Sequence, residues 1–441
     1  MNMHFSSSRP FRPVQYLGNK TRLLDDIAEA IAEVVAPGRR VGDLFSGTSV
    51  VGRRLAERNL VTAVDVQAYA ATIGRTMLTT PAADVRALDR SRLLSRAEEA
   101  AGTLATAFGS LIAREEDALR RLAEGDPAPL ELLIESGSAV SLYQSGEAHR
   151  LPVAIKRMLE SDGADAPDAT AALTFGGVYF SFQQAVWIDA IASAATAEVE
   201  PVRVAIVTAL LGAASEAVNT VGKQFAQPVR LRNSDGAPKG LLIGRTLRDR
   251  AIDIRASFLD HLGKLEAALL VAPGANRVIQ SEVDDFLAAD DECEGYYADP
   301  PYTIDHYSRF YHVLETLVLR DRPRLATMRW RGVPTIMRGL YREDRHQSDF
   351  CVPSRAPGAF HRLAGAARRR GIPLVLSYSG HIDSEQRSRL LSLEQLRALL
   401  REHFSSVDVI SPTFEGHRKL NADRNNLATE RGSERLIICR S

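Results

Sequence analysis

The chain has 441 residues, and its 55 Lys and Arg residues balance 55 Asp and Glu residues, so the formal net charge at pH 7 is zero. This length predicts two domains rather than one, and the charge balance excludes a globally basic nucleic-acid-binding protein. Three widely separated cysteines, Cys293, Cys351 and Cys439, exclude a zinc motif or a disulfide framework and predict free thiols in a reducing cytoplasm. No metal site is expected, and the longest apolar run, Val204–Ser215, is too short to cross a bilayer, so no membrane contact is expected.

The first predicted elements form one half of a nucleotide-binding sheet. Residues 16–20 read Tyr-Leu-Gly-Asn-Lys and precede a helix with its apolar residues on one face. A short apolar strand then leads into residues 43–47, Asp-Leu-Phe-Ser-Gly, before a second helix, and the next strand ends at Asp65. The glycine lets the backbone approach a ligand, and an acid after the second strand accepts ribose hydroxyls. The spacing is not G-x-G-x-x-G, which disfavours a dinucleotide.

Residues 81–275 change to Ala- and Leu-rich helical segments with few strand signals. The window 220–255 holds eight basic residues and three acids, a net charge of 8 − 3 = +5 in an otherwise neutral chain. Local positive charge suits phosphate contacts, so DNA contacts are predicted for Lys223, Arg230, Arg232 and Lys239. A solvated helix face is the alternative. A cluster of aromatic and amide residues at 176–184 is a second candidate, although such density is more typical of a core.

The most informative motif lies in residues 296–303, Tyr-Tyr-Ala-Asp-Pro-Pro-Tyr-Thr. Two consecutive prolines cannot lie inside a helix or a central strand, so this segment predicts a strand that ends in a rigid turn. The turn presents Asp299, backbone carbonyls at Pro300 and Pro301, and the ring of Tyr302. An exocyclic amino group on a planar base needs such a set, because the acid and a carbonyl accept its two hydrogens while the ring stacks on the base.

Alternating strands and helices flank this motif. A strand is expected from Arg277 towards Glu282, and beyond the motif the loop 304–312 combines aromatic, hydroxyl and cationic side chains. Helices are then expected at 360–370 and 393–403, and strands at 374–378, 407–410 and 435–439.

In the order and spacing of these segments the chain resembles the Dam-like, alpha group of S-adenosylmethionine-dependent N6-adenine DNA methyltransferases. That family opens with aromatic-x-Gly-Gly-Lys, continues with Asp/Glu-x-Phe-x-Gly and an acid after the second strand, and carries an inserted recognition domain before Asp-Pro-Pro-Tyr. The resemblance covers about the first 80 and the last 165 residues. Asn19 replaces the second glycine and Tyr16 stands where Trp is common, which puts the cofactor affinity in question but leaves Lys20 in place.

The resemblance implies a doubly wound, Rossmann-like α/β methyltransferase sheet with a mostly helical inserted domain. Residues 1–80 would be the cofactor-binding half, residues 81–275 the target-recognition insert, and residues 276–441 the catalytic half. It further implies S-adenosyl-L-methionine as the cofactor and double-stranded DNA as the partner. Whether a cognate restriction endonuclease accompanies the protein stays open.

The resemblance also implies roles for single residues. The cofactor site would contain Tyr16, Lys20, Phe45, Ser46, Gly47, Asp65, Glu282 and Asp299; catalysis would fall to Asp299, Pro300, Pro301 and Tyr302; and Tyr307 and Arg309 would lie beside the target base. Register favours Glu282 for the cofactor adenine, with Asp284 as the alternative. Other methyl acceptors (cytosine N4 in DNA or guanine N2 in rRNA) and a catalytically decayed DNA-binding protein remain as rival interpretations.

Overall fold

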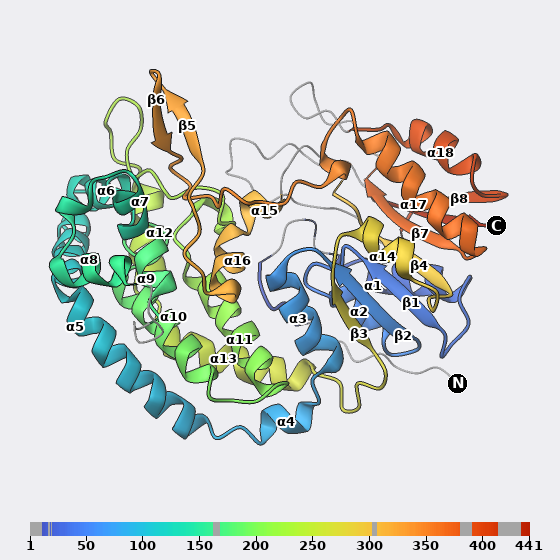
Figure 1. The fold of residues 1–441 in the computed structure, drawn as a ribbon, viewed down its shortest axis with the longest axis horizontal. Coiled ribbons are helices and arrows are strands. Elements are labelled where there is room, and N and C mark those ends of the chain that lie inside the picture. The colour runs from blue at the N-terminus through green and yellow to red at the C-terminus, as the bar shows by residue number, and fades with distance from the viewer. Residues whose placement is uncertain are drawn as a thin grey trace.

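The computed structural model describes residues 11–15, 18, 20–161, 168–301, 307–379, 390–412 and 434–441. It is a mixed α/β structure in which a seven-stranded sheet lies beside a large helical body (Figure 1). Within the described residues, no helix combines the length and the apolar character needed to cross a bilayer. Cys293, Cys351 and Cys439 are all buried.

The sheet is mostly parallel. Its strands are β1 (Arg40–Leu44), β2 (Leu60–Asp65), β3 (Arg277–Gln280), β4 (Gly295–Ala298), β7 (Leu374–Ser379), β8 (Ser406–Ile410) and β9 (Glu434–Arg440). Their order is β3-β2-β1-β4-β7-β9-β8, and only β9 runs antiparallel to its neighbours. Every residue of β1 and β4 is buried, as expected for parallel strands covered on both faces. The expected α/β sheet is therefore confirmed at this level.

Helices cover both faces of the sheet. One face packs against α1 (Leu24–Ala32) and α2 (Val50–Leu55), and the other against α14 (Val283–Ala289), α17 (Ala356–Arg370) and α18 (Leu393–Arg401). The chain leaves β1 towards β2 on one side, whereas β4 lies on the other side of β1 and leads on to β7. The carboxyl ends of β1 and β4 are thus a topological switch point, where open α/β sheets bind ligands.

The helical body consists of long apolar helices and short connectors. They are α4 (Ala82–Arg86), α5 (Arg90–Ala123), α6 (Ala128–Glu135), α7 (Ala139–Gln144), η1 (Ala148–Arg150), α8 (Val153–Glu160), α9 (Thr170–Phe175), α10 (Phe182–Ala195), α11 (Val202–Ala217), η2 (Val221–Lys223), α12 (Gly240–Arg250) and α13 (Ile254–Ala268). With 34 residues, α5 is about 50 Å long at 1.5 Å per residue. Helix α3 (Ala68–Thr79) packs against both parts, since it contacts β3 as well as α11.

The segment after the motif packs against the helical body, although the sequence assigned it to the catalytic half. It contains α15 (Tyr307–Phe310), α16 (His312–Leu319), β5 (Thr327–Trp330), β6 (Val333–Ile336) and η3 (Asp349–Cys351). Of these, η3 packs instead against α17 through Phe350 and Phe360. Apolar side chains of α16 are buried in the same core cluster as those of α9, α10 and α11. The separate hairpin of β5 and β6 was not anticipated from the sequence.

Candidate functional site

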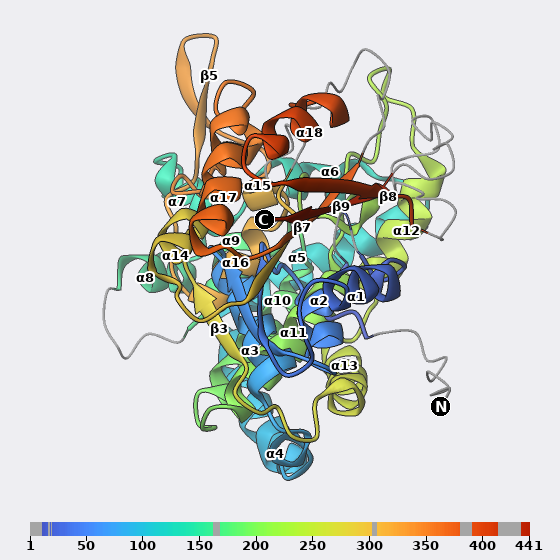
Figure 2. The same ribbon diagram turned by 90° about the vertical axis from the view of Figure 1, so that its right-hand side faces the viewer.

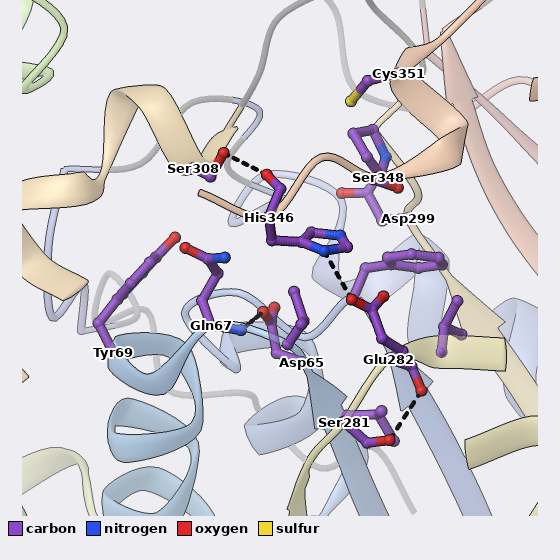
Figure 3. A pocket seen from close by; sticks show the side chains of 15 residues that line it. Asp65, Gln67, Tyr69, Ser281, Glu282, Asp299, Ser308, His346, Ser348 and Cys351 are labelled. Carbon is purple, nitrogen blue, oxygen red and sulfur yellow. Dashed lines mark hydrogen bonds and ion pairs between the residues drawn. The ribbon is translucent and has the colours of Figure 1, made fainter. Parts of the chain in front are cut away.

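A pocket of about 840 Å³, including its mouth, lies at the carboxyl ends of β1 to β4 (Figure 3). Residues that follow all four strands line it, together with residues from α3, α15 and η3: Phe45, Val64, Asp65, Val66, Gln67, Tyr69, Ser281, Glu282, Val283, Asp299, Pro301, Ser308, His346, Ser348 and Cys351. The switch point of the sheet and the pocket therefore coincide.

Asp65 is fixed at the end of β2 by backbone donors. Its carboxylate accepts the N–H of Gly47 and the N–H of Gln67, each at 2.9 Å. Burial raises the pKa of Asp65, while these two hydrogen bonds favour the ionised form. Each carboxylate oxygen has a further lone pair, so the side chain can still accept hydrogen bonds from a ligand in the pocket.

The turn after β1 has an unusual backbone. Phe45, Gly47 and Ser49 have positive φ angles of 61°, 51° and 52°. Gly47 adopts this conformation without cost, whereas a phenylalanine does so only where the surroundings impose it, as at ligand sites. The ring of Phe45 lines the pocket and packs edge-on against Phe350, with 5.1 Å between the ring centroids. Ser46, also predicted to bind cofactor, does not line the pocket; its N–H donates to the carbonyl of Val64 at 3.0 Å.

Lys20 joins two acids from opposite parts of the sequence. Its Nζ lies 3.0 Å from Asp299 after β4 and 2.6 Å from Glu434 at the start of β9, and only 4% of its side chain is exposed. Glu434 also accepts a hydrogen bond from the Ser377 hydroxyl at 2.8 Å. A buried ammonium is tolerated because both carboxylates compensate its charge. This cluster orients Asp299 at the pocket wall.

Asp43, the last residue but one of β1, lies beneath this cluster. It is 1% exposed, and its Oδ2 has no hydrogen-bond partner among the described residues. Burial raises the pKa of Asp43 to about 8; the backbone of Gly52 opposes this shift, and the charges of Asp299 and Asp65 add smaller contributions to it. Gly52 allows this approach, because a Cβ there would lie 2.8 Å from Oδ2 of Asp43. The raised pKa favours the protonated, neutral form of Asp43 next to the charges of Asp299 and Asp65.

The acids after β3 have different environments. Glu282 lines the pocket, where its carboxylate lies 2.7 Å from Nδ1 of His346 (Figure 3). Burial raises the pKa of Glu282, and the nearby His346 opposes this shift. Asp284 instead pairs with Arg362 at 2.8 Å and does not line the pocket. Of the two alternatives left by the sequence, Glu282 is the one with access to a ligand.

The residues expected near the target base are only partly described. Tyr16 and Tyr302, and the side chain of Tyr307, lie outside the described residues. Pro301 lines the pocket and Pro300 is buried behind it. The guanidinium of Arg309 lies over the ring of Tyr341, 4.8 Å from its centroid, and is absent from the pocket lining.

The basic window divides into internal and exposed charges. Lys223 pairs with Asp249 at 2.8 Å and donates to the carbonyl of Val218 at 3.1 Å, so it is engaged inside the protein. Arg250 is fully buried against Glu115 of α5. Arg245 pairs with Asp249, and Arg255 pairs with Glu98 and lies over the ring of Trp187. The members left on the surface are Arg230, Arg232, Lys239 and Arg248, of which Arg230 and Arg232 pair with Glu135 and Glu131. The charge that could meet DNA is thus smaller than the window's composition indicates.

Several pocket residues had no signal in the sequence. His346, Ser348 and Cys351 reach the pocket from a segment far beyond the motif, and Ser308 supports it by donating to the carbonyl of His346 at 2.6 Å. Gln67 could have been found, since it follows the predicted acid Asp65 by two residues.

No protein-family model matches the chain, and no curated protein sequence is similar to it. The functional assignment therefore depends on the residues and their geometry. The pocket combines acids suited to hydroxyl and amino groups, an aromatic wall and a carboxylate held by a buried lysine. Such a set can bind a nucleoside-like ligand and orient an amino group beside it.

Proposed function

We propose that the protein is an S-adenosylmethionine-dependent methyltransferase that modifies N6 of adenine in duplex DNA. The observation that carries the proposal is the convergence of Asp65, Glu282 and Asp299 in one pocket at the switch point of the sheet. Asp65 and Asp299 were predicted from separate strand ends of the sequence, and the resemblance added Glu282, with Asp284 as the alternative. Fold similarity alone would not support a function, because one fold hosts many activities.

The residues present fit a bound S-adenosylmethionine. Asp65 has lone pairs for the ribose hydroxyls, Glu282 can accept the adenine amino group, and Phe45 supplies an apolar wall. When bound, the cofactor supplies an electrophilic methyl group. The sheet order, with one antiparallel strand near its edge, is compatible with the methyltransferase core that the resemblance implies.

The chain's own contribution to the reaction is positioning and electrostatics. The adenine has to leave the base stack, because its amino group is inaccessible inside a duplex. Asp299 and the Pro300 carbonyl would accept the two amino hydrogens, which aims the nitrogen lone pair along one direction. Lys20 keeps the Asp299 carboxylate oriented through its contact at 3.0 Å. Such preorganised contacts lower the barrier without a covalent intermediate.

The test is methyl transfer from labelled cofactor to plasmid DNA and to ribosomal RNA in parallel, followed by digestion to nucleosides. We expect labelled N6-methyladenine from DNA with the wild-type protein. Label in N4-methylcytosine or in rRNA guanine would replace the proposed acceptor by one of the alternatives. Cofactor binding without transfer to either nucleic acid would indicate a decayed enzyme. Sequencing of the methylated DNA would then identify the recognised site.

A further inference from the structure

A well-formed β-hairpin projects from the helical body. Strands β5 and β6 pair antiparallel, with Trp330 opposite Val333, and Arg331 and Gly332 form the two-residue turn. Their φ angles of 48° and 84° are both positive, as in the type I′ turn whose twist matches that of a hairpin. In both views the hairpin and the loop before α12 project from the same end of the molecule (Figures 1 and 2).

The hairpin exposes side chains that isolated surface strands normally avoid. The pairing register puts Met328, Trp330 and Val333 on one face, with 47%, 60% and 62% of their surfaces exposed. Arg329 lies on the other face and Arg331 at the tip, and neither forms an ion pair with a described residue. Exposed apolar strands promote aggregation unless a partner covers them, so this surface is expected to bind something.

The base of the hairpin is held firmly. The guanidinium of Arg342 forms a fork with Asp321 at 2.6 and 2.7 Å and contacts Asp344 at 2.9 Å. Arg338 donates to the carbonyl of Val229 at 2.7 Å, next to the basic window. The tip is therefore presented by a fixed support rather than by a loose loop.

The hairpin is also joined to the pocket. The chain leaves the pocket at Ser308 and returns to it at His346, and the Ser308 hydroxyl donates to the His346 carbonyl at 2.6 Å (Figure 3). The hairpin lies in the middle of the chain segment between these two residues. The pocket residues Ser308 and His346 and the hairpin thus belong to one continuous segment of the chain.

We propose that the β5–β6 hairpin contacts the duplex DNA whose adenine enters the pocket, with Arg329 and Arg331 on phosphates and Trp330 against the bases. This inference rests on the proposed function. Residues 320–345 contain eight arginines and three acids. Two of the acids pair with Arg342 at the base and the third, Glu343, lies 3.7 Å from Arg324, which leaves only positive charge at the tip. The phosphates of a duplex match the arginines, and an exposed apolar side chain such as Trp330 can insert between base steps from a groove.

Tryptophan fluorescence tests the proposal directly, because the chain contains only two tryptophans, Trp187 and Trp330. Trp187 lies on α10 with the Arg255 guanidinium 4.5 Å from its ring. In Trp187→Phe, sheared genomic duplex DNA should quench the remaining Trp330 emission and protect it from acrylamide. In the matched variant Trp330→Phe, the emission of Trp187 should not change.

Binding measurements give a second readout. Trp330→Ala should weaken duplex binding by about tenfold, as expected when an aromatic contact to bases is lost. Replacing Arg329 and Arg331 with Ala should lower the slope of log affinity against log salt by about 1.8, or 0.9 for each phosphate contact. Arg58→Ala and Val271→Ala, both exposed and outside the hairpin, are the controls that should leave affinity and slope unchanged.

DNA binding to Trp187→Phe can be followed independently by the anisotropy of labelled DNA. If Trp330 emission does not change at DNA concentrations that saturate this binding, the inference is wrong and the apolar face of the hairpin binds a different partner. That outcome leaves the proposed function intact. A wild-type protein that does not bind duplex DNA at any salt concentration would remove the inference and the proposed DNA substrate together.

Discussion

Replacing Asp65 with alanine should weaken S-adenosylmethionine binding by about 10²- to 10⁴-fold. The carboxylate already accepts two backbone N–H groups, and its remaining lone pairs face the pocket. If they accept two ribose hydroxyls, two charge-assisted hydrogen bonds of about 1.5–3 kcal/mol each are lost. The sum of about 3–6 kcal/mol converts to this range at 1.4 kcal/mol per tenfold.

The same change also removes a structural acceptor. The N–H groups of Gly47 and Gln67 both lose their partner, which costs about 1–3 kcal/mol for each donor that stays buried. Asp65→Asn separates the two effects, because its oxygen still accepts one of the N–H groups while the charge is gone. Its fold should be less affected than that of Asp65→Ala.

Calorimetric titration of the cofactor into each variant measures the effect, with the thermal midpoint recorded for the same samples. Asp260→Ala is the matched control, since that acid is 53% exposed on α13 and pairs only with the nearby Lys264 among the described residues. Its affinity should equal that of the wild type. A folded Asp65→Ala protein with affinity within threefold of the wild type would show that Asp65 serves only the turn.

Four further variants test other parts of the site. Asp299→Ala should abolish methyl transfer in a labelled-cofactor assay. The variant should remain folded, because Lys20 keeps its contact with Glu434 at 2.6 Å. Activity within about tenfold of wild type would contradict the catalytic role proposed for Asp299. Lys20→Met should lower the free energy of unfolding by about 3–5 kcal/mol, because it removes the buried ammonium that the Asp299 and Glu434 carboxylates share. In urea titrations, adding Glu434→Gln should restore part of this loss. If the two substitutions destabilise additively, Lys20 and Glu434 do not form a buried ion pair. The pKa of Asp43 is about 8 in the folded state, against 3.8 when unfolded, so the free energy of unfolding should fall as pH rises between these values. Asp43→Asn should make this fall shallower by up to about 1.36 kcal/mol per pH unit. An unchanged pH profile of stability would show that Asp43 ionises normally. Replacing Arg230, Arg232 and Lys239 with Ala should lower the slope of log DNA affinity against log salt concentration by up to about 2.7 and leave cofactor affinity unchanged. An unaltered slope would show that the basic window is a solvated surface that does not contact DNA.

The acids of the pocket were predictable because their signals are local. Asp65 and Asp299 each follow an apolar strand, and parallel strands bring their carboxyl ends to one edge of the sheet. The prolines after Asp299 mark the end of β4 without any knowledge of its neighbours. For the acid after β3, the sequence left Glu282 and Asp284 as alternatives. The structure distinguishes them, because Asp284 forms an ion pair with Arg362.

Contacts between distant segments were not predictable. The charge count of the basic window could not include Glu115, which lies on α5 and neutralises Arg250 inside the core. Glu434 meets Lys20 only because β9 inserts antiparallel between β7 and β8. The hairpin had a weak signal, since Arg331-Gly332 lies between two short alternating segments, but strands of four residues are too short for a clear period.

Helix α3 has a consequence for how the two ligands would influence each other. Glu315 of α16, in the helical body, accepts the N–H groups of Ala68 and Tyr69 at 2.9 and 3.1 Å. These donors begin the helix that follows directly from Asp65 and Gln67 at the pocket. The joint between the two parts is thus a capped helix end rather than a free hinge. Any displacement of α16 on DNA binding would be transmitted to Asp65, so the two proposed ligands should each alter the affinity of the other by the same factor.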